Sequence, residues 1–362
     1  MDTISLARGI PAPECIPVDE LADCARAAIE RDGTTVLSYG PVGGYQPLRE
    51  WIAERHGVEP ARVLVTNGSL QGIAFLADRF AGGRVLVEQP TYDRPLKLLA
   101  ARGAEITPIA MDDEGLDPDA LAEALGAGPK PAFLYTIPTF QNPSGRTLSV
   151  ERRKRVVELA REHDLLVLED DPYGRVRFEG EAPPTLFELD GGERVVYSSS
   201  FSKTIAPGLR VGYFILPEAL DAELEAIAVS TYITPVLLGQ ATVYEFLRRG
   251  QFRSNLARVR ELLRARRDAM LEALEQELPG ATWSRPQGGY FVWLELPGEL
   301  RGTPGVAVVP GTDFGGAANT VRLAFSYVSP DEIREGVRRL SAAVAARGEA
   351  AAAAPASRGY AA

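Results

Sequence analysis

Short apolar runs alternate with longer amphipathic stretches from about Arg62 to Tyr213, and this alternation limits the possible folds of the chain more than any other feature. Apolar runs of strand length separated by helix-length segments are typical of strand–helix–strand units, which build a parallel sheet covered by helices. The sequence therefore predicts an α/β domain with a mostly parallel sheet between helices. The seven predicted strands cover residues 62–66, 84–87, 104–108, 132–136, 165–168, 194–198 and 211–215.

The pattern changes after Pro235, where apolar residues recur at roughly helical spacing through an Arg- and Glu-rich segment. A later helix opens with the capping box Ser329-Pro-Asp-Glu332. We therefore expect a large domain over 31–235 and a smaller α+β domain over 236–347. An alanine-rich tail over 348–362 has no hydrophobic face and is expected to be poorly ordered. The strands predicted for the smaller domain are 289–295, 306–309 and 320–326.

The composition indicates a globular protein that binds neither nucleic acid nor a membrane. The 362 residues are 45% hydrophobic and carry a formal net charge of −10, without a cluster of basic residues interleaved with aromatics. Cys15 and Cys24 are too few for a disulfide framework, and with His56 and His163 as the two histidines a metal site is not expected. No signal-like or membrane-spanning apolar segment is seen, so we expect a cytoplasmic location.

Lys203 is an unusual lysine, because it follows a predicted apolar strand and is one of only four lysines among 39 basic residues. Arginine stays protonated, whereas a desolvated lysine can lose its proton and form a Schiff base with an aldehyde. The hydroxyls of Ser198-Ser-Ser-Phe-Ser202 and the nearby Arg210 would suit a phosphate group. Together these residues suggest pyridoxal phosphate as a cofactor.

Two further segments follow predicted strands, at the sheet edge where α/β proteins bind ligands. Thr66-Asn-Gly-Ser69 precedes an apolar helix whose N-terminus could bind a phosphate, although a tight turn capped by serine explains it equally well. In Glu169-Asp170-Asp171, one carboxylate could hold a pyridine nitrogen protonated, with Tyr173 donating to a ring oxygen. Glu169 and one of the two aspartates would then belong to a solvated turn.

Three other side chains could complete such a site. Asn142 offers an amide donor from a turn-rich segment, although Asn-Pro turns are common. Tyr92 could stack on a cofactor ring or lie at the rim of the pocket. Arg322 is a charge inside an otherwise apolar strand, which requires an anion: either a substrate carboxylate or an internal salt bridge.

These motifs occur in the order found in fold-type I pyridoxal phosphate enzymes of the class I/II aminotransferases, and the chain resembles that family. Within it, the resemblance is nearest to the α-aminoadipate/kynurenine aminotransferase branch and to the aminotransferase-like domains of GntR-type regulators. Segments 4–14, 37–49 and 286–293 also match that branch. The resemblance covers about residues 4–347.

The resemblance implies that Lys203 forms the Schiff base and moves the proton, and that Asp170 pairs with the pyridine nitrogen. It implies that Tyr173 and Asn142 contact the ring phenoxide and that Tyr92 stacks on the ring. It further implies a homodimer and an N-terminal arm, residues 1–30, packed on the small domain. The phosphate would be bound by Ser69, the Leu70 backbone, Ser200, Arg210 and Tyr39 of the partner subunit, and the substrate by Arg322, Asn142, Gly9 and Arg8.

The chain departs from the family pattern in three places. Arg8 stands where this branch usually has glycine, so it could add a positive charge for a second acidic group of the substrate or simply face solvent. Leu70 replaces a commonly polar residue in the phosphate turn. Residues 298–304 form a short connection where relatives insert a helix, which trims the small domain.

The activity implied is transamination, in which an amino group moves from an L-amino acid to a 2-oxo acid by a ping-pong mechanism through a Lys203 Schiff base. An elimination, cyclisation or oxidative reaction on an amino acid would use the same residues and stays open. A third possibility is a ligand-sensing regulatory domain. Such regulators carry a winged helix-turn-helix before this module, whereas this chain starts directly at Ile4-Ser-Leu6.

Overall fold

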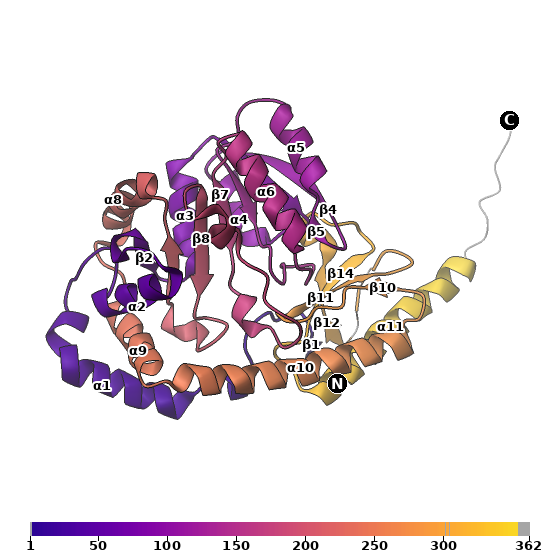
Figure 1. Ribbon diagram of the computed structural model, residues 1–362. Helices are drawn as coiled ribbons and strands as arrows, with labels where there is room; N and C mark the ends of the chain where they lie inside the picture. The colour runs from indigo at the N-terminus through magenta and orange to yellow at the C-terminus, as the bar shows by residue number, and fades with distance from the viewer. Residues whose placement is uncertain (1, 301, 304, 354–362) are drawn as a thin grey trace.

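A central eight-stranded sheet forms the large domain of the computed structural model, which describes residues 2–300, 302–303 and 305–353 (Figure 1). The strand order is β2-β9-β8-β7-β6-β3-β4-β5, and β8, β7, β6, β3 and β4 are parallel to their neighbours in that run. β9 is antiparallel to both β2 and β8, and β5 is antiparallel to β4. The strands are β2 Val63–Thr66, β3 Arg84–Gln89, β4 Glu105–Asp112, β5 Gly115–Leu116, β6 Phe133–Thr136, β7 Val167–Asp170, β8 Val195–Ser200 and β9 Gly212–Ile215.

The predicted α/β class with a mostly parallel sheet is confirmed, but the predicted number of strands is wrong. Seven strands coincide with the predicted apolar runs, and β5 is an additional strand at the sheet edge. Its two residues, Gly115 and Leu116, pair with the end of β4 as a short hairpin. A strand of this length carries no apolar run, so sequence periodicity could not reveal it.

Helices cover both faces of this sheet, because successive strand residues point to opposite sides. In β8, Tyr197 joins a core with α1, α2, α5, α6, α7 and α9, whereas Val196 joins a second core with α3, α4 and α8. Ser149 begins α6 as an N-cap that accepts a hydrogen bond from the Arg152 N–H. These helices are α1 Val18–Val36, α2 Gln46–His56, α3 Ser69–Arg79, α4 Asp93–Ala100, α5 Pro118–Gly126, α6 Val150–Glu162, α7 Leu186–Asp190, α8 Asp221–Tyr232 and α9 Leu237–Arg248.

The small domain packs two long helices, α10 Gln251–Glu277 and α11 Pro330–Ala353, against a four-stranded antiparallel sheet of order β10-β11-β14-β13. Ser329 and Glu332 form the predicted capping box at the start of α11. Because α11 continues to Ala353, the first part of the predicted tail is helical, and residues 354–362 lie outside the described residues. The strands are β10 Thr282–Trp283, β11 Phe291–Glu295, β13 Val309–Pro310 and β14 Thr320–Ala324.

The first part of the predicted N-terminal arm lies on the small domain, whereas α1, which begins at Val18, packs into a core of the large domain. β1 Ile4–Ser5 pairs in parallel with β12 Val306–Ala307, and the Leu6 carbonyl accepts a hydrogen bond from the Ala324 N–H. The predicted strand 306–309 is therefore divided between two sheets, since β13 pairs with β14 instead. This placement carries the residues after Leu6 towards the large domain.

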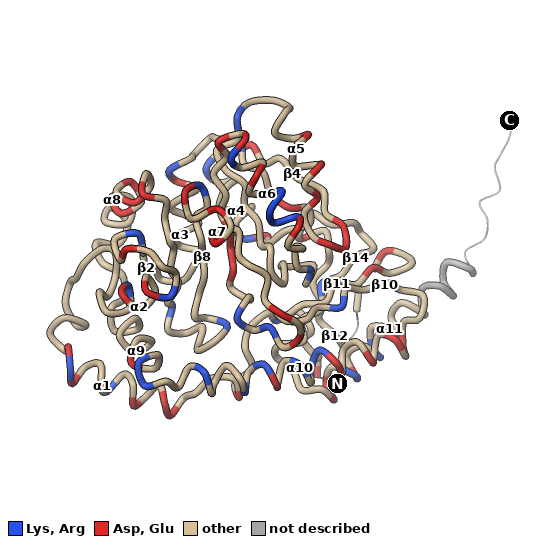
Figure 2. The backbone as a smooth tube through the Cα atoms, viewed as in Figure 1, with Lys and Arg blue, Asp and Glu red and all other residues tan. Residues whose placement is uncertain are grey.

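Short 3-10 helices connect several elements, and the outer helices are strongly charged. Both basic and acidic residues lie along α10 and α11 (Figure 2), with surface ion pairs such as Arg338–Glu335 at 2.6 Å. Within the described residues, no helix is both long and apolar enough to cross a membrane. The 3-10 helices are η1 Pro13–Cys15, η2 Pro60–Arg62, η3 Gly174–Val176, η4 Pro207–Leu209, η5 Glu218–Leu220 and η6 Gly311–Phe314.

Candidate active site

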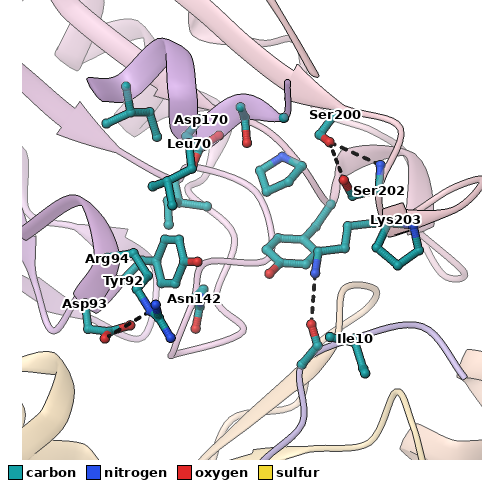
Figure 3. A pocket seen from close by; sticks show the side chains of 18 of the residues that line it. Ile10, Leu70, Tyr92, Asp93, Arg94, Asn142, Asp170, Ser200, Ser202 and Lys203 are labelled. Carbon is teal, nitrogen blue, oxygen red and sulfur yellow. Dashed lines mark hydrogen bonds and ion pairs between the residues drawn. The ribbon is translucent and has the colours of Figure 1, made fainter. Parts of the chain in front are cut away.

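A pocket of about 430 Å³ lies where the carboxyl ends of β3, β6, β7 and β8 meet the small domain (Figure 3). It brings together almost all the side chains predicted from the sequence, although they come from eight separate segments of the chain. Parallel strands place their carboxyl ends at one sheet edge, which explains this convergence. The predicted residues that line it are Gly9, Ser69, Leu70, Tyr92, Asn142, Asp170, Tyr173, Ser200, Lys203, Arg210 and Arg322.

The Lys203 side chain reaches into the pocket from the turn after β8. Its Nζ donates a hydrogen bond to the Gly9 carbonyl at 2.8 Å and lies 5.2 Å from the centre of the Tyr290 ring. Burial, helped by the positive charges of Arg322 and Arg210, lowers the pKa of Lys203 to about 8. A substantial fraction of this amine is therefore neutral near pH 8 and able to act as a nucleophile or base.

Asp170 ends β7 with its carboxylate in the pocket wall. It is 3% exposed and accepts hydrogen bonds from the hydroxyls of Tyr135 and Ser198, both at 3.1 Å. Burial raises the pKa of Asp170 to about 7, although these two hydroxyl donors oppose the shift. Sequence reasoning missed both donors. Ser198 lies directly opposite Asp170 in the register of β7 and β8, so only the strand pairing could have identified it.

The solvated acidic turn expected around Asp170 is wrong, because all three consecutive acids are buried. Glu169 faces the opposite side of the sheet and accepts hydrogen bonds from the backbone N–H groups of Leu186 and Phe187 at 3.0 and 2.9 Å. Asp171 accepts from the Gly174 N–H at 2.8 Å. Strand alternation thus leaves Asp170 as the one member of the trio that lines the pocket.

Donors for an anion gather at one end of the pocket. The helix α3 begins at Ser69, and its N-cap is Gly68, which has no side chain to accept a hydrogen bond, so the alternative of a serine-capped turn is not observed. Gly68 has a φ of 89°, and a Cβ at this position would clash with the Arg210 guanidinium. The glycine therefore permits Arg210 to lie close to the N-terminus of α3. Ser202, one of the hydroxyls expected to suit a phosphate group, also lines the pocket, with its hydroxyl 2.9 Å from that of Ser200.

Arg322 supplies an uncompensated positive charge on the opposite wall. Its Nη1 donates to the Asn142 Oδ1 at 3.0 Å and its Nη2 to the Ala7 carbonyl at 2.9 Å, while Nε is buried without a partner. The guanidinium also stacks on the Phe291 ring, 4.3 Å from its centre. Among the described residues it forms no ion pair, so the internal salt bridge is not observed. Because Asn142 Oδ1 is engaged, the amide NH₂ remains available as a donor.

Two predicted residues lie outside this pocket. Arg8 stacks on the Tyr327 ring at 5.1 Å and does not line the cavity. Tyr39 is 80% exposed on the surface of the chain. Conversely, Asp93 and Arg94 at the start of α4 line the mouth of the pocket without having been predicted. Tyr290 is 1% exposed, and its hydroxyl donates to the Lys203 carbonyl at 3.1 Å.

Comparisons of the chain with known proteins identify its family. The family model for aminotransferase class I and II matches residues 6–340. The chain is 37% identical to aromatic-amino-acid aminotransferase 1 of Thermococcus litoralis, over 94% of this chain and 87% of that protein. It is 40% identical to 2-aminoadipate transaminase of Thermus thermophilus, over 94% and 90%.

A solved structure agrees with these sequence matches. The α-aminoadipate aminotransferase of Thermus thermophilus, complexed with N-(5′-phosphopyridoxyl)-L-leucine, superposes with a TM-score of 0.90. The two chains are 38% identical, and the match covers 97% of this chain and 93% of the other.

Proposed function

The chain belongs to the aminotransferase class I and II family, and on this premise we propose that Lys203, Asp170 and Arg322 are the core of its transamination site. The protein is a pyridoxal 5′-phosphate-dependent aminotransferase that moves an amino group from an amino acid to a 2-oxo acid. The observation that carries our residue assignment is the desolvated Lys203 amine, held in one pocket with a buried carboxylate and an unpaired guanidinium.

The pocket residues fit this cofactor. Ser69, Ser200, Ser202 and Arg210 offer donors for its phosphate, and the glycine at position 68 leaves room for the backbone to approach that group. When bound, the cofactor supplies an electron sink for negative charge on the α-carbon of the amino acid. We infer that the Asp170 carboxylate keeps its ring nitrogen protonated, which strengthens that effect.

Tyr173, Asn142 and Tyr92 then orient the ring. Burial raises the pKa of Tyr173 well above its ordinary value, so its hydroxyl stays protonated and can donate to the ring oxygen. The free NH₂ of Asn142 can donate to the same oxygen. Tyr92, which lies beside Asn142 in Figure 3, would cover one face of the ring.

Arg322 and Lys203 act on the substrate itself. A carboxylate that accepts from the Arg322 guanidinium would supply the anion that this buried charge lacks. The substrate α-carbon would thereby be held towards the Lys203 amine. Lys203, once free and neutral, would take the α-proton and deliver it again as the amino group is transferred.

A half-reaction assay tests this function. With one amino acid and no 2-oxo acid, the bound cofactor should convert once to its amine form and then stop, because no acceptor regenerates it. Stopped-flow absorbance with a panel of L-amino acids would measure this single turnover. Continued product formation without a 2-oxo acid would instead establish an elimination or related reaction.

The titration of Lys203 gives a pH-dependent prediction. Only the neutral form of the Lys203 amine would react with an aldehyde, so the rate at which the cofactor-free protein binds the cofactor covalently should rise about tenfold per pH unit below pH 8 and level off above it. Stopped-flow absorbance at a fixed cofactor concentration would follow this rate. Pyridoxine phosphate, which has no aldehyde, controls for pH effects on non-covalent binding. A rate that still rises steeply at pH 9–10 would contradict the lowered pKa.

We also infer that two subunits associate through an exposed apolar surface formed by Leu37, Tyr39, Val229, Ile233 and Val236, which are each 48–80% exposed. The segments that carry them adjoin, since the Gly40 N–H donates to the Thr234 hydroxyl at 3.3 Å. Tyr39 from one subunit could then reach the other subunit's cofactor phosphate.

The double variant Leu37→Asp/Ile233→Asp should shift the protein from dimer to monomer, because two buried charges oppose association. Sedimentation velocity would measure this shift. Ala342→Asp, at an exposed position on α11, is the matched control and should leave the sedimentation coefficient unchanged. A wild-type protein that sediments as a monomer at micromolar concentration would exclude the dimer.

A further inference from the structure

Glu88 is a buried carboxylate close to the site that the mechanism above does not use. It lies near the end of β3, is 2% exposed, and does not line the pocket. Its Oε1 accepts from the Thr136 hydroxyl at 2.6 Å. Its Oε2 accepts from the Ile137 N–H at 3.1 Å and from the Gln141 Nε2 at 3.0 Å. All three donors belong to β6 or to the segment that follows it.

Gln141 completes a connection between two loops. Its Nε2 also donates to the Pro90 carbonyl at 2.8 Å, and its Oε1 accepts from the Ser144 N–H at 2.8 Å. The side chain therefore contacts the β3–α4 loop on one side and its own loop on the other. Each polar atom of this amide has a partner, as expected for a buried polar network that fixes one geometry.

The two loops joined in this way carry different parts of the cofactor site. Tyr92 follows Pro90 by two residues, and Asn142 directly follows Gln141. Asn142 in turn accepts the hydrogen bond from Arg322. The Glu88–Gln141 contact thus links the segment that carries Tyr92 to the segment that carries Asn142, two groups that Figure 3 shows on the same side of the pocket.

We propose that Glu88 and Gln141 are positioning residues that hold Tyr92 and Asn142 in register for binding of the cofactor ring. This inference rests on the proposed roles of Tyr92 and Asn142. It explains why a carboxylate is buried where an apolar side chain would stabilise the fold more simply, since an isolated buried charge is costly. Only an acceptor at position 88 satisfies Thr136, Ile137 and Gln141 together.

The electrostatics agree with this geometry. Burial raises the pKa of Glu88, whereas its three hydrogen bonds lower it and favour the ionised form. The charge of Glu88 also contributes to raising the pKa of Asp170. Loss of the carboxylate should therefore alter the pH titration of the bound cofactor as well as its affinity.

Glu88→Gln keeps the shape and removes the charge: with its NH₂ towards the Thr136 hydroxyl, its carbonyl oxygen can still accept from Ile137 and Gln141, but these bonds are no longer charge-assisted and the Thr136 hydroxyl loses its acceptor. We expect the affinity of the cofactor-free protein for pyridoxal phosphate to fall about tenfold or more, as is typical when a buried partner is lost. Equilibrium absorbance titration measures this affinity independently of turnover.

Glu169→Gln is the matched control. Like Glu88, Glu169 is deeply buried, lies near the end of a parallel strand and accepts hydrogen bonds from backbone N–H groups. However, it faces away from the pocket. Both variants should lose thermal stability, whereas only Glu88→Gln should lose cofactor affinity and shift the pH titration of the bound cofactor. Gln141→Met, which removes the same contact without touching the charge, should lower the affinity if Glu88→Gln fails to fold.

Equal cofactor affinity in wild type, Glu88→Gln and Gln141→Met would overturn the inference, as would equal losses in Glu88→Gln and Glu169→Gln. These outcomes differ from a failure of the proposed function. In that case the wild-type protein itself would not bind pyridoxal phosphate or complete the half-reaction.

Discussion

Replacing Lys203 with alanine should reduce turnover by about 10⁴-fold or more, because one side chain is expected both to bind the cofactor covalently and to move the substrate proton. The pocket offers no substitute base at this position, since the other lysines, Lys97, Lys130 and Lys154, do not line it. Steady-state transamination measures the loss. Absorbance spectroscopy should show that the visible band of the lysine-bound cofactor disappears as well.

The controls for this variant separate charge from proton transfer. Lys203→Arg retains a positive charge but cannot become neutral, so it should be as inactive as Lys203→Ala. Lys154→Ala, on the exposed surface of α6, should behave as wild type in both assays. A Lys203→Ala protein with near wild-type turnover would remove Lys203 from the mechanism.

Asp170→Asn should lower turnover by about 10²–10³-fold while leaving the protein folded. The neutral amide cannot stabilise a protonated ring nitrogen, so the electron sink weakens, and charge-assisted contacts of this kind are among the strongest available to a site. The cofactor should still bind through its phosphate and Lys203. Single-turnover kinetics with an amino acid would assign the loss to the chemical step.

The stability of this variant provides an independent check. Burial raises the pKa of Asp170 to about 7, which means that its charged form destabilises the folded, cofactor-free protein. Asp170→Asn should therefore melt at the same temperature as wild type or higher at pH 7.5. A large fall in melting temperature together with the loss of activity would point to a structural role instead.

Much of the site could be predicted from the sequence because most of its residues lie just after or at the end of a strand. Lys203, Asp170 and Asn142 each follow an apolar run, and strand ends are readable from a single segment. Tyr135 and Glu88 could not be assigned in this way. Each lies within a strand as an isolated polar residue, and its role depends on the neighbouring strand and on which face it occupies.

Two expectations were wrong for the same reason: the single strand at 306–309 and the solvated turn that includes Glu169. The strand predicted at 306–309 is divided because Val306 pairs with the N-terminal segment and Val309 with β14, partners that are remote in sequence. Burial of Glu169 and Asp171 likewise depends on backbone N–H groups and a hydroxyl from other segments. Polarity alone indicates a solvated turn, whereas tertiary hydrogen bonds reverse that expectation.

The pairing of β1 with β12 also bears on the order in which the chain acquires its structure. Ile4 and Ser5 are synthesised long before their strand partners, Val306 and Ala307. Contacts between segments so distant in sequence form late in folding, because closing the long intervening loop costs conformational entropy before the contact can stabilise the chain. The Gly9 carbonyl that receives the Lys203 amine thus reaches its place only after the small domain exists. The central sheet can therefore form early in folding, whereas the pocket is complete only when the N-terminal segment has paired with the small domain.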